Sequence, residues 1–378
     1  MKIGVVGGGN GGLTVALTLL NETFERGKKG GFLNSAQDVE IEVYYDPNVP
    51  IEKVGQGSLI NFVGLLSDVL GMNWYDNPID ATFKTGILYE GWGNQKDKFF
   101  HPFPFDSMSI HYSPSKLREY MIEKKVCKFI EQNVEDCNDI DCDYVFDCRG
   151  TPTDFSYYNI LKNPLNSVVL GQDNYRDPDQ NWTRCSATPD GWCFGIPNKG
   201  FTSYGYLYND KYTTNEDAKA NMKEMFGVDA TDTLHFKNYL ARKPIVNDKV
   251  ILNGNRLMFI EPLEASSVET YHRWTLLVCE WIFDGRSKRE ILQDLVTDVE
   301  EVQNFVLWHY ATGSKYATMF WSEAEEMARS HSYDEVFFDF IREAKGSTMK
   351  DLVYDDGGTY AHWYATSFKN WVDGTQPI

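Results

Sequence analysis

The sequence predicts an α/β fold with a βαβ unit at the N-terminus, an antiparallel sheet in the middle third and a helical C-terminal region. Residues 2–6 form an apolar strand that ends in a glycine-rich turn, and a helix follows over residues 13–20. A second strand over residues 39–45 completes the unit, after a polar, glycine-rich loop over residues 27–35. Residues 167–209 are rich in β-forming and turn residues, which is typical of antiparallel strands.

The other elements follow in chain order. We expect helices over residues 58–70, 114–124 and 267–283, and strands over residues 82–89, 144–146 and 250–252. Ser113 caps the second of these helices, because its side chain can accept from a free amide while Pro114 fixes φ in the first turn. Residues 91–105 are expected to be irregular. Helices continue to about Arg342, and irregular structure is expected after it.

Composition limits the classes of function. A hydrophobic share of 42% and a charged share of 24% indicate a soluble globular protein, and no apolar stretch approaches the ~20 residues needed to span a bilayer. The formal charge of -19 argues against nucleic acid or an anionic membrane as partner. Any anion site must therefore be built from backbone N–H groups or a helix N-terminus.

The seven cysteines show no C-x-x-C spacing, so neither a zinc site nor a disulfide framework is predicted, and a reducing cytoplasm fits best. No signal peptide is expected, because the strand over residues 2–6 already belongs to the fold.

A dinucleotide fingerprint stands in the first turn. Gly7, Gly9 and Gly12 match G-x-G-x-x-G between a strand and a helix, where the glycines allow a tight turn, a close approach to pyrophosphate and helix packing. Asp46, at the end of the second strand, is the candidate ribose ligand, although Asp-Pro is also a turn signal. Asp147 and Gly150 resemble the second flavin signature of Rossmann-type flavoproteins. Together they predict a Rossmann-type fold that binds FAD.

Residues 259–267, Phe-Ile-Glu-Pro-Leu-Glu-Ala-Ser-Ser, resemble the F-x-E-P-L-E-[SA]-[TS] segment of the flavin-dependent tryptophan halogenase family. Four further segments resemble the family in its own order, at residues 47–58, 83–87, 191–208 and 309–321. Gln56 replaces a family Glu, and Phe194 replaces the second Trp of W-x-W-x-I-P. The resemblance covers residues 1–325. With 378 residues the chain is shorter than bacterial tryptophan halogenases and is similar in length to phage-borne halogenases.

The resemblance implies a mechanism. Reduced FAD and oxygen give a flavin hydroperoxide that oxidises halide (chloride, bromide or iodide) to hypohalous acid, which travels to a lysine and halogenates an electron-rich aromatic substrate of the indole or phenol type. Lys84 takes the lysine position, where desolvation would lower the pKa of its amine. Without the family match, a solvent-facing strand lysine would be the better interpretation.

Further site residues are implied by the same resemblance. Glu264 would orient Lys84 and accept the ring proton, although an acidic residue before a helix also suits the helix dipole. Ser266 and Ser267 would hold halide with their amides or simply cap the helix. Trp192 and Phe194 would form a wall between flavin and substrate. Arg242 would contact the flavin, or it could equally be a surface charge. His309 and Tyr310 are expected to be structural packing residues.

The predicted organisation has three parts. Residues 1–160 with 240–285 form a discontinuous FAD-binding module, residues 161–239 a substrate-side sheet, and residues 286–378 a helical region over the substrate site. Because one dinucleotide fingerprint is present, a separate flavin reductase is expected to supply reduced FAD. A homo-oligomer is left open. Two alternatives also stand: an FAD-dependent monooxygenase, and a flavin-binding protein without catalytic activity, the latter favoured by Gln56 and Phe194.

Overall fold

The computed structural model describes residues 1–28, 39–51, 54–58, 60–103, 107–353 and 358–375. Most of the predicted loop over residues 27–35 lies outside the described residues.

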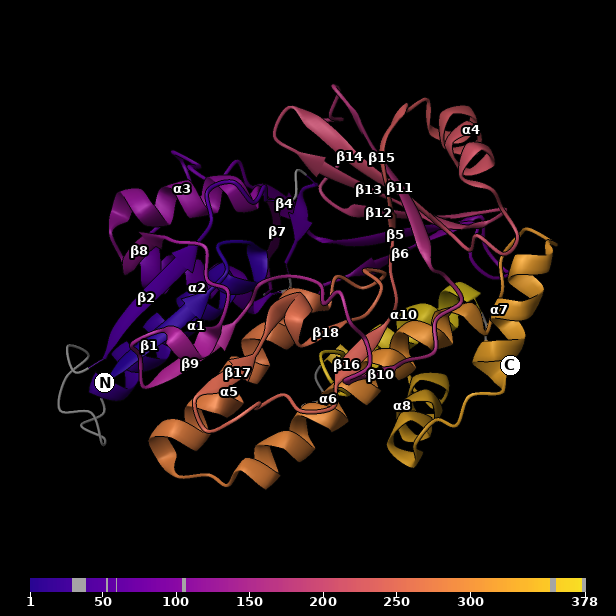
Figure 1. The fold of residues 1–378 in the computed structure, drawn as a ribbon. Coiled ribbons are helices and arrows are strands. Elements are labelled where there is room, and N and C mark those ends of the chain that lie inside the picture. Colours follow the sequence, from indigo (N-terminus) through magenta and orange to yellow (C-terminus); the bar gives the residue numbers. More distant parts are fainter. Residues whose placement is uncertain (29–38, 52–53, 59, 104–106, 354–357, 376–378) are drawn as a thin grey trace.

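The N-terminal part of the molecule is built on a parallel sheet with the strand order β17-β9-β1-β2-β8. Its strands are β1 (Lys2–Val6), β2 (Glu40–Tyr45), β8 (Lys128–Glu131), β9 (Tyr144–Asp147) and β17 (Val250–Leu252). Helix α1 (Asn10–Lys28) lies between β1 and β2 in the chain and packs on α5 (Ser267–Asp284). The predicted βαβ unit and the Rossmann-type arrangement are confirmed (Figure 1).

A second, larger sheet has the strand order β15-β11-β14-β13-β12-β5-β6. Its strands are β5 (Gly86–Glu90), β6 (Lys98–Pro102), β11 (Ser167–Asp173), β12 (Thr183–Thr188), β13 (Gly191–Asn198), β14 (Phe201–Tyr208) and β15 (Ala230–His235). β12 and β5 pair in parallel, and the other neighbours are antiparallel. The antiparallel middle third is confirmed. The sheet also takes two strands from residues 86–102, outside the range 161–239 predicted for it.

Strand β6 lies where we expected irregular structure, so that expectation is wrong. Side chains alternate along it, with Phe99 and His101 buried and Phe100 facing outward. The strand forms because it pairs with β5 at the edge of the larger sheet. A flanking stretch rich in aromatic, glycine and charged residues hides this alternation in the sequence.

The predicted strand over residues 82–89 is in fact two strands that meet at Thr85. β4 (Thr82–Lys84) belongs to a small sheet with β3 (Gln56–Gly57) and β7 (Ser109–Tyr112), whereas β5 belongs to the larger sheet. Another small sheet contains β10 (Tyr158–Ile160), β16 (Tyr239–Ala241) and β18 (Met258–Phe259). The chain therefore bridges two sheets directly beside Lys84.

The helices predicted over residues 58–70, 114–124 and 267–283 lie close to those ranges, whereas α1 is longer than the predicted 13–20. The described helices besides α1 and α5 are α2 (Asn61–Leu70), α3 (Pro114–Lys124), α4 (Asn215–Phe226), α6 (Lys288–Tyr310), α7 (Met319–Arg329), α8 (Glu335–Gly346), α9 (Met349–Val353) and α10 (Ala365–Thr375). Ser113 caps α3 as predicted, since its side chain accepts a hydrogen bond from the amide of Lys116. None of the helices in the described ranges is long and apolar enough to cross a membrane.

We expected irregular structure after Arg342, and this expectation is wrong, because helices α9 and α10 lie there. Helix α10 packs against α8 and β6 and buries Phe368 and Trp371 almost completely. The ring of Trp371 packs against the ring of His309, with centroids 4.0 Å apart and the planes tilted by 45°. This burial stabilises a short helix that would be marginal alone.

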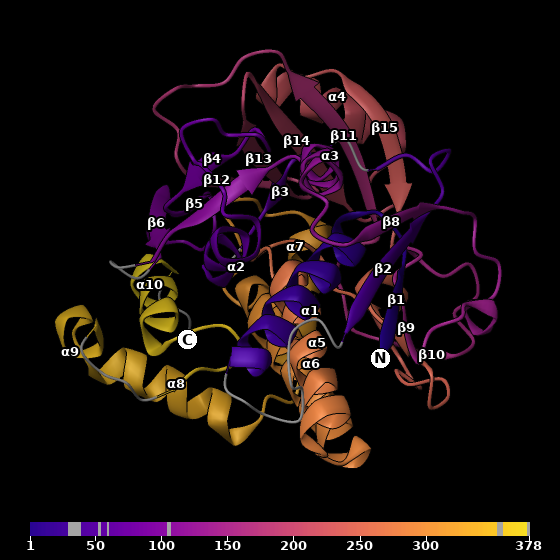
Figure 2. The ribbon, with the colours of Figure 1, turned by 90° about the vertical axis from the view of Figure 1, so that its left-hand side faces the viewer.

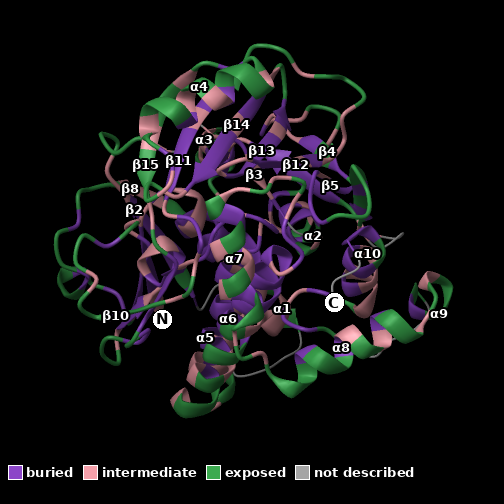
Figure 3. Cartoon of the chain, turned by 90° about the vertical axis from the view of Figure 1, so that its right-hand side faces the viewer, coloured by how far each residue is buried: buried purple, intermediate pink, exposed green. Residues whose placement is uncertain are grey.

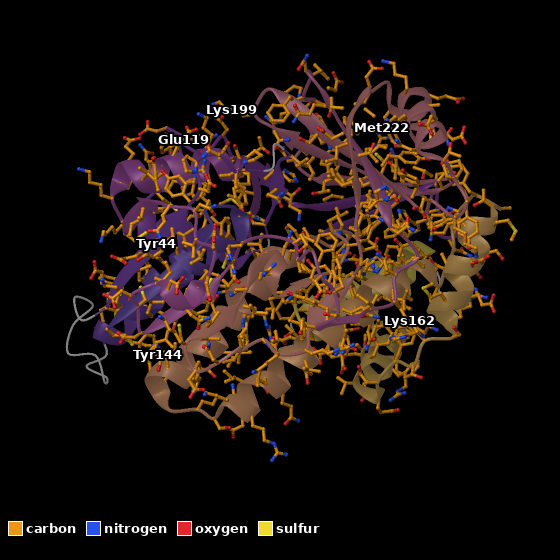
Figure 4. All side chains as sticks on the ribbon, viewed as in Figure 1. Tyr44, Glu119, Tyr144, Lys162, Lys199 and Met222 are labelled. Atoms are coloured by element: carbon orange, nitrogen blue, oxygen red, sulfur yellow. The ribbon has the colours of Figure 1, made fainter. Side chains whose placement is uncertain are left out.

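The buried residues are concentrated in the strands and in the inner faces of α5 and α6, whereas α4 and α8 present many exposed residues (Figure 3). Figure 2 shows α1 and α5 side by side near the parallel sheet. Side chains fill the space between the sheets and helices (Figure 4). In that view the labelled residues Tyr44 and Tyr144 lie on the parallel sheet, and Met222 lies on α4, the helix that packs on the larger sheet.

Replacing Trp371 with alanine is expected to lower the free energy of unfolding by about 3–5 kcal/mol, because a buried indole leaves a cavity. Urea unfolding would measure the loss. Val353→Ala is the control, since Val353 is 54% exposed and should change stability by no more than about 0.5 kcal/mol. Equal unfolding midpoints for the two variants would contradict the packing role of α10.

Candidate active site

The three fingerprint glycines lie in the turn between β1 and α1. Gly7 has φ +126°, and a β-carbon there would lie 2.5 Å from the carbonyl oxygen of Cys148. A β-carbon on Gly12 would lie 1.9 Å from the carbonyl oxygen of Gly7. At Gly9, by contrast, a β-carbon would meet no atom within 4 Å. The turn thus leaves open space beside a helix N-terminus, which suits a pyrophosphate group.

The two acidic candidates lie where the parallel strands end, but both have protein partners. Asp46 follows β2, and its Oδ1 accepts from the backbone N of Asn48 at 2.8 Å, which is the turn arrangement left open by the sequence. Asp147 is buried at the end of β9 and pairs with Arg149, at 2.9 Å from Nη2. Gly150 follows in the left-handed region with φ +77°.

Lys84 is fully buried, although its neighbour Phe83 on β4 is 56% exposed. Its Nζ donates to the carbonyl oxygen of Ser58 at 3.3 Å and lies 5.1 Å from the centroid of the Phe103 ring. Burial lowers the pKa of the amine to about 8, against a smaller opposing attraction to Glu264. The solvent-facing alternative is therefore wrong.

Glu264 is also buried, just before α5. Its Oε1 accepts from the Tyr89 hydroxyl and lies 2.9 Å from His309 Nε2 and 3.6 Å from His101 Nδ1. Its Oε2 accepts from Trp363 Nε1 at 3.2 Å. Burial would raise the pKa of this carboxyl, but the imidazoles of His101 and His309 hold it below its usual range.

The structure brings Lys84 and Glu264 into one buried region. A β-carbon on Gly57 would lie 3.3 Å from Lys84 Nζ and 3.7 Å from the β-carbon of Ala265, the residue that follows Glu264. Within the described part of the chain, no ion pair as short as 4 Å joins the two side chains. The amine and the carboxylate therefore lie in the same buried region and interact electrostatically without forming a contact pair.

Trp192 and Phe194 lie on one face of β13 with ring centroids 6.2 Å apart. Trp192 donates to Glu261 Oε2 at 3.3 Å, and the hydroxyl of Tyr310 donates to the same carboxylate at 2.8 and 2.9 Å. Burial raises the pKa of Glu261 to about 7 despite these donors. The predicted wall residue is thus anchored to helix α6 through a buried carboxyl.

The remaining candidates have mixed surroundings. Ser266 precedes α5, and its buried Oγ has no hydrogen-bond partner among the residues described; Ser267 is the first residue of α5. Ala265 adopts φ +54° and turns the chain into that helix. Arg242 is exposed and donates to Asn159 at 3.0 Å, which is the surface arrangement left open by the sequence.

Sequence reasoning missed four side chains at the site: Tyr89, His101, Glu261 and Trp363. Glu261 lies in the same nine-residue segment as Glu264, so that segment carried a usable signal. His101 was hidden in an unrecognised strand. No group of three or more His, Cys, Asp or Glu suited to a metal ion occurs within the described ranges.

The fold and the site together define a protein with a Rossmann-type parallel sheet, a buried lysine and a buried carboxylate. The sequence model of the tryptophan halogenase family matches residues 2–140 and 133–365. The chain belongs to this family.

Curated relatives are distant. Tryptophan 6-halogenase ThaL of Streptomyces albogriseolus is 22% identical over 226 residues, 57% of this chain and 42% of its own length. Tryptophan 7-halogenase RebH of Lentzea aerocolonigenes is 22% identical over 296 residues, 69% of this chain and 55% of its own. The chain thus spans about half the length of these relatives. Xcc4156, a flavin-dependent halogenase from Xanthomonas campestris, superposes with a TM-score of 0.79 at 15% identity, covering 100% of this chain and 89% of that one.

Gly9→Ala is expected to weaken FAD binding about 10-fold, which corresponds to roughly 1.4 kcal/mol, with little change in thermal stability. The reason is that the added methyl group meets no protein atom but enters the space offered to the pyrophosphate. Titration followed by flavin fluorescence measures the affinity. The control is Gly64→Ala, which lies exposed on α2. Unchanged FAD affinity in Gly9→Ala would remove this turn from the cofactor site.

Proposed function

We propose that the chain is a flavin-dependent halogenase acting on a small electron-rich aromatic compound of the indole or phenol type. The observation that carries this proposal is the fully buried amine of Lys84 in the same buried region as the carboxylate of Glu264. Burying ionisable groups is costly, so such groups mark candidate functional sites, and family membership supplies the corresponding chemistry.

FAD fits the open space beside Gly9. Gly7, Gly9 and Gly12 would hold its pyrophosphate, and the Asp46, Asp147 and Gly150 turns would border it. When reduced FAD is bound, it would react with oxygen and so supply the oxidant that converts halide to hypohalous acid. The amides of Ser266 and Ser267 would hold the halide (chloride, bromide or iodide), since they begin a helix and the hydroxyl of Ser266 has no hydrogen-bond partner among the described residues.

The amine of Lys84 is then the acceptor of the halogen. Its nitrogen forms a bond to the halogen of hypohalous acid while the oxygen–halogen bond breaks, and an amine proton joins the leaving hydroxide to give water. The substrate ring next takes the halogen as the nitrogen–halogen bond breaks; the electron pair of that bond stays on nitrogen, which takes up a proton from solvent, so that the amine of Lys84 is restored. Glu264 would accept the ring proton and release it to solvent, because it lies in the same buried region and its pKa is held below the usual range.

The other assignments follow from this function. Trp192 and Phe194 would separate the cofactor from Lys84 and Glu264. Arg242 remains a proposed contact with the flavin. We propose the three-part organisation given above, with the larger sheet extended by β5 and β6. A separate flavin reductase would supply reduced FAD. Cysteines are unpaired among the described residues, which suits a cytoplasmic protein.

Lys84→Ala is expected to retain FAD binding and to lower brominated product by about 100-fold or more, because the halogen acceptor is lost. The assay supplies FAD, a flavin reductase, NADH and bromide with a panel of indoles and phenols, followed by mass spectrometry. Lys199→Ala is the control, since Lys199 is exposed on the surface (Figure 4). Hydroxylated products from the wild type would instead indicate a monooxygenase, and unmodified substrates an inactive flavin-binding protein.

The rate of bromination should rise with pH through about 8, the pKa to which burial lowers Lys84, and should level off above it. The rate rises with pH because the amine of Lys84, and not its ammonium form, accepts the halogen. Bromination is therefore lost as the pH falls and the amine is protonated. Steady-state kcat/KM between pH 6 and 9.5 tests this. A rate that falls through pH 8 would show that Lys84 acts as an ammonium donor.

A further inference from the structure

His309 lies at the centre of the site and has no part in the proposed function so far. It is fully buried on α6, where the ring of Trp371 packs against its ring at a tilt. Its two ring nitrogens have different partners: Nδ1 lies 2.6 Å from the carbonyl oxygen of Phe305, and Nε2 lies 2.9 Å from Oε1 of Glu264. These contacts determine which atoms carry protons.

A carbonyl oxygen can only accept, so Nδ1 of His309 carries a hydrogen. If the ring were neutral, Nε2 would then present a lone pair to the carboxylate, which also has only lone pairs when ionised. The Tyr89 hydroxyl also lies 3.4 Å from Nε2, but its hydrogen is donated to Oε1. A proton must therefore lie in the 2.9 Å contact between Nε2 and Oε1 of Glu264. The remaining question is which of the two groups owns that proton.

The surroundings of Glu264 favour the carboxylate form. Tyr89 donates to Oε1 and Trp363 donates to Oε2, so both oxygens receive hydrogen bonds as an ionised carboxylate requires. The pKa of Glu264 is held below its usual range although burial raises it. If the carboxylate is the ionised partner, the proton of the 2.9 Å contact belongs to Nε2 of His309.

The other ionisable groups around Glu264 are held less closely than His309. Nδ1 of His101 on β6 lies 3.6 Å from Oε1, which is within reach of an ion pair but longer than a hydrogen bond, whereas Nε2 of His309 lies at 2.9 Å. Cys185 on β12 interacts with Glu264 electrostatically, and burial raises the pKa of its thiol well above the usual value. Lys84 on β4 donates to the carbonyl of Ser58 instead of to a carboxylate.

We propose that His309 carries the positive charge that pairs with Glu264, and that Lys84 is thereby left free to be an uncharged amine. This inference rests on the halogenase function proposed above, in which the amine accepts the halogen and the carboxylate accepts the ring proton. His309 is a positioning residue, since it acts through Glu264. Without it, the ammonium of Lys84 would be the cation available to the carboxylate.

The first test uses His309→Asn, which keeps a side-chain hydrogen-bond donor but cannot be charged. The rising limb of the pH profile of bromination should move up by about one pH unit, since the carboxylate now stabilises the ammonium of Lys84. Product formation at pH 7 should fall about 10-fold and recover above pH 9. His235→Gln is the control, because His235 is exposed on β15. A uniform loss at every pH, with no shift of the limb, would overturn the proposal.

The second test reads protonation directly and does not depend on a folded His309 variant. The chain has seven histidines, so ¹⁵N-histidine NMR of the wild type can resolve them. At pH 8, where an ordinary histidine of pKa about 6.5 is neutral, one ring should be doubly protonated. That signal should change to a neutral ring protonated at Nδ1 in Glu264→Gln. A wild type with only neutral rings at pH 8 would overturn the proposal.

The two proposals fail in different ways. If the wild type forms no brominated product while NMR shows the charged ring, the halogenase function is wrong and the Glu264–His309 pair stands. If the wild type brominates and requires Lys84 but the ring is neutral, the function stands and the role of His309 is wrong.

Discussion

The candidate active site depends on keeping the carboxylate of Glu264 charged inside the protein. An isolated buried carboxylate would take up a proton, because desolvation penalises the charged form. Here Tyr89, His101, His309 and Trp363 surround it, and they come from β5, β6, α6 and the segment before α10. The two sheets and the C-terminal helices must therefore all be in place before this one group can be ionised.

A second carboxyl three residues earlier has the opposite character. Glu261 is equally buried, but its carboxylate accepts hydrogen bonds from the neutral donors Tyr310 and Trp192, and burial raises its pKa to about 7. The same nine-residue segment thus carries one carboxyl whose pKa imidazoles hold below the usual range and one whose pKa burial raises. Environment, not residue type, separates the two.

The sequence predicted the local features of this molecule well. The βαβ unit, the cap at Ser113 and the burial of Lys84 followed from short patterns or from the family segment. It failed where a residue's role depends on a partner far along the chain. Tyr89 lies 175 positions from Glu264 and His309 lies 45 positions from it, and no periodicity links them. His309 was accordingly taken as a packing residue.

The alternation of side chains along β4 and β6 limits how this site can change length. Phe83 and Phe100 point outward while Lys84 and His101 point inward, so one residue inserted within either strand would exchange the two sets. Insertions that preserve the chemistry are therefore confined to the turns that connect these strands. Relatives with larger or smaller substrate chambers should differ there, with the strands themselves unchanged in length.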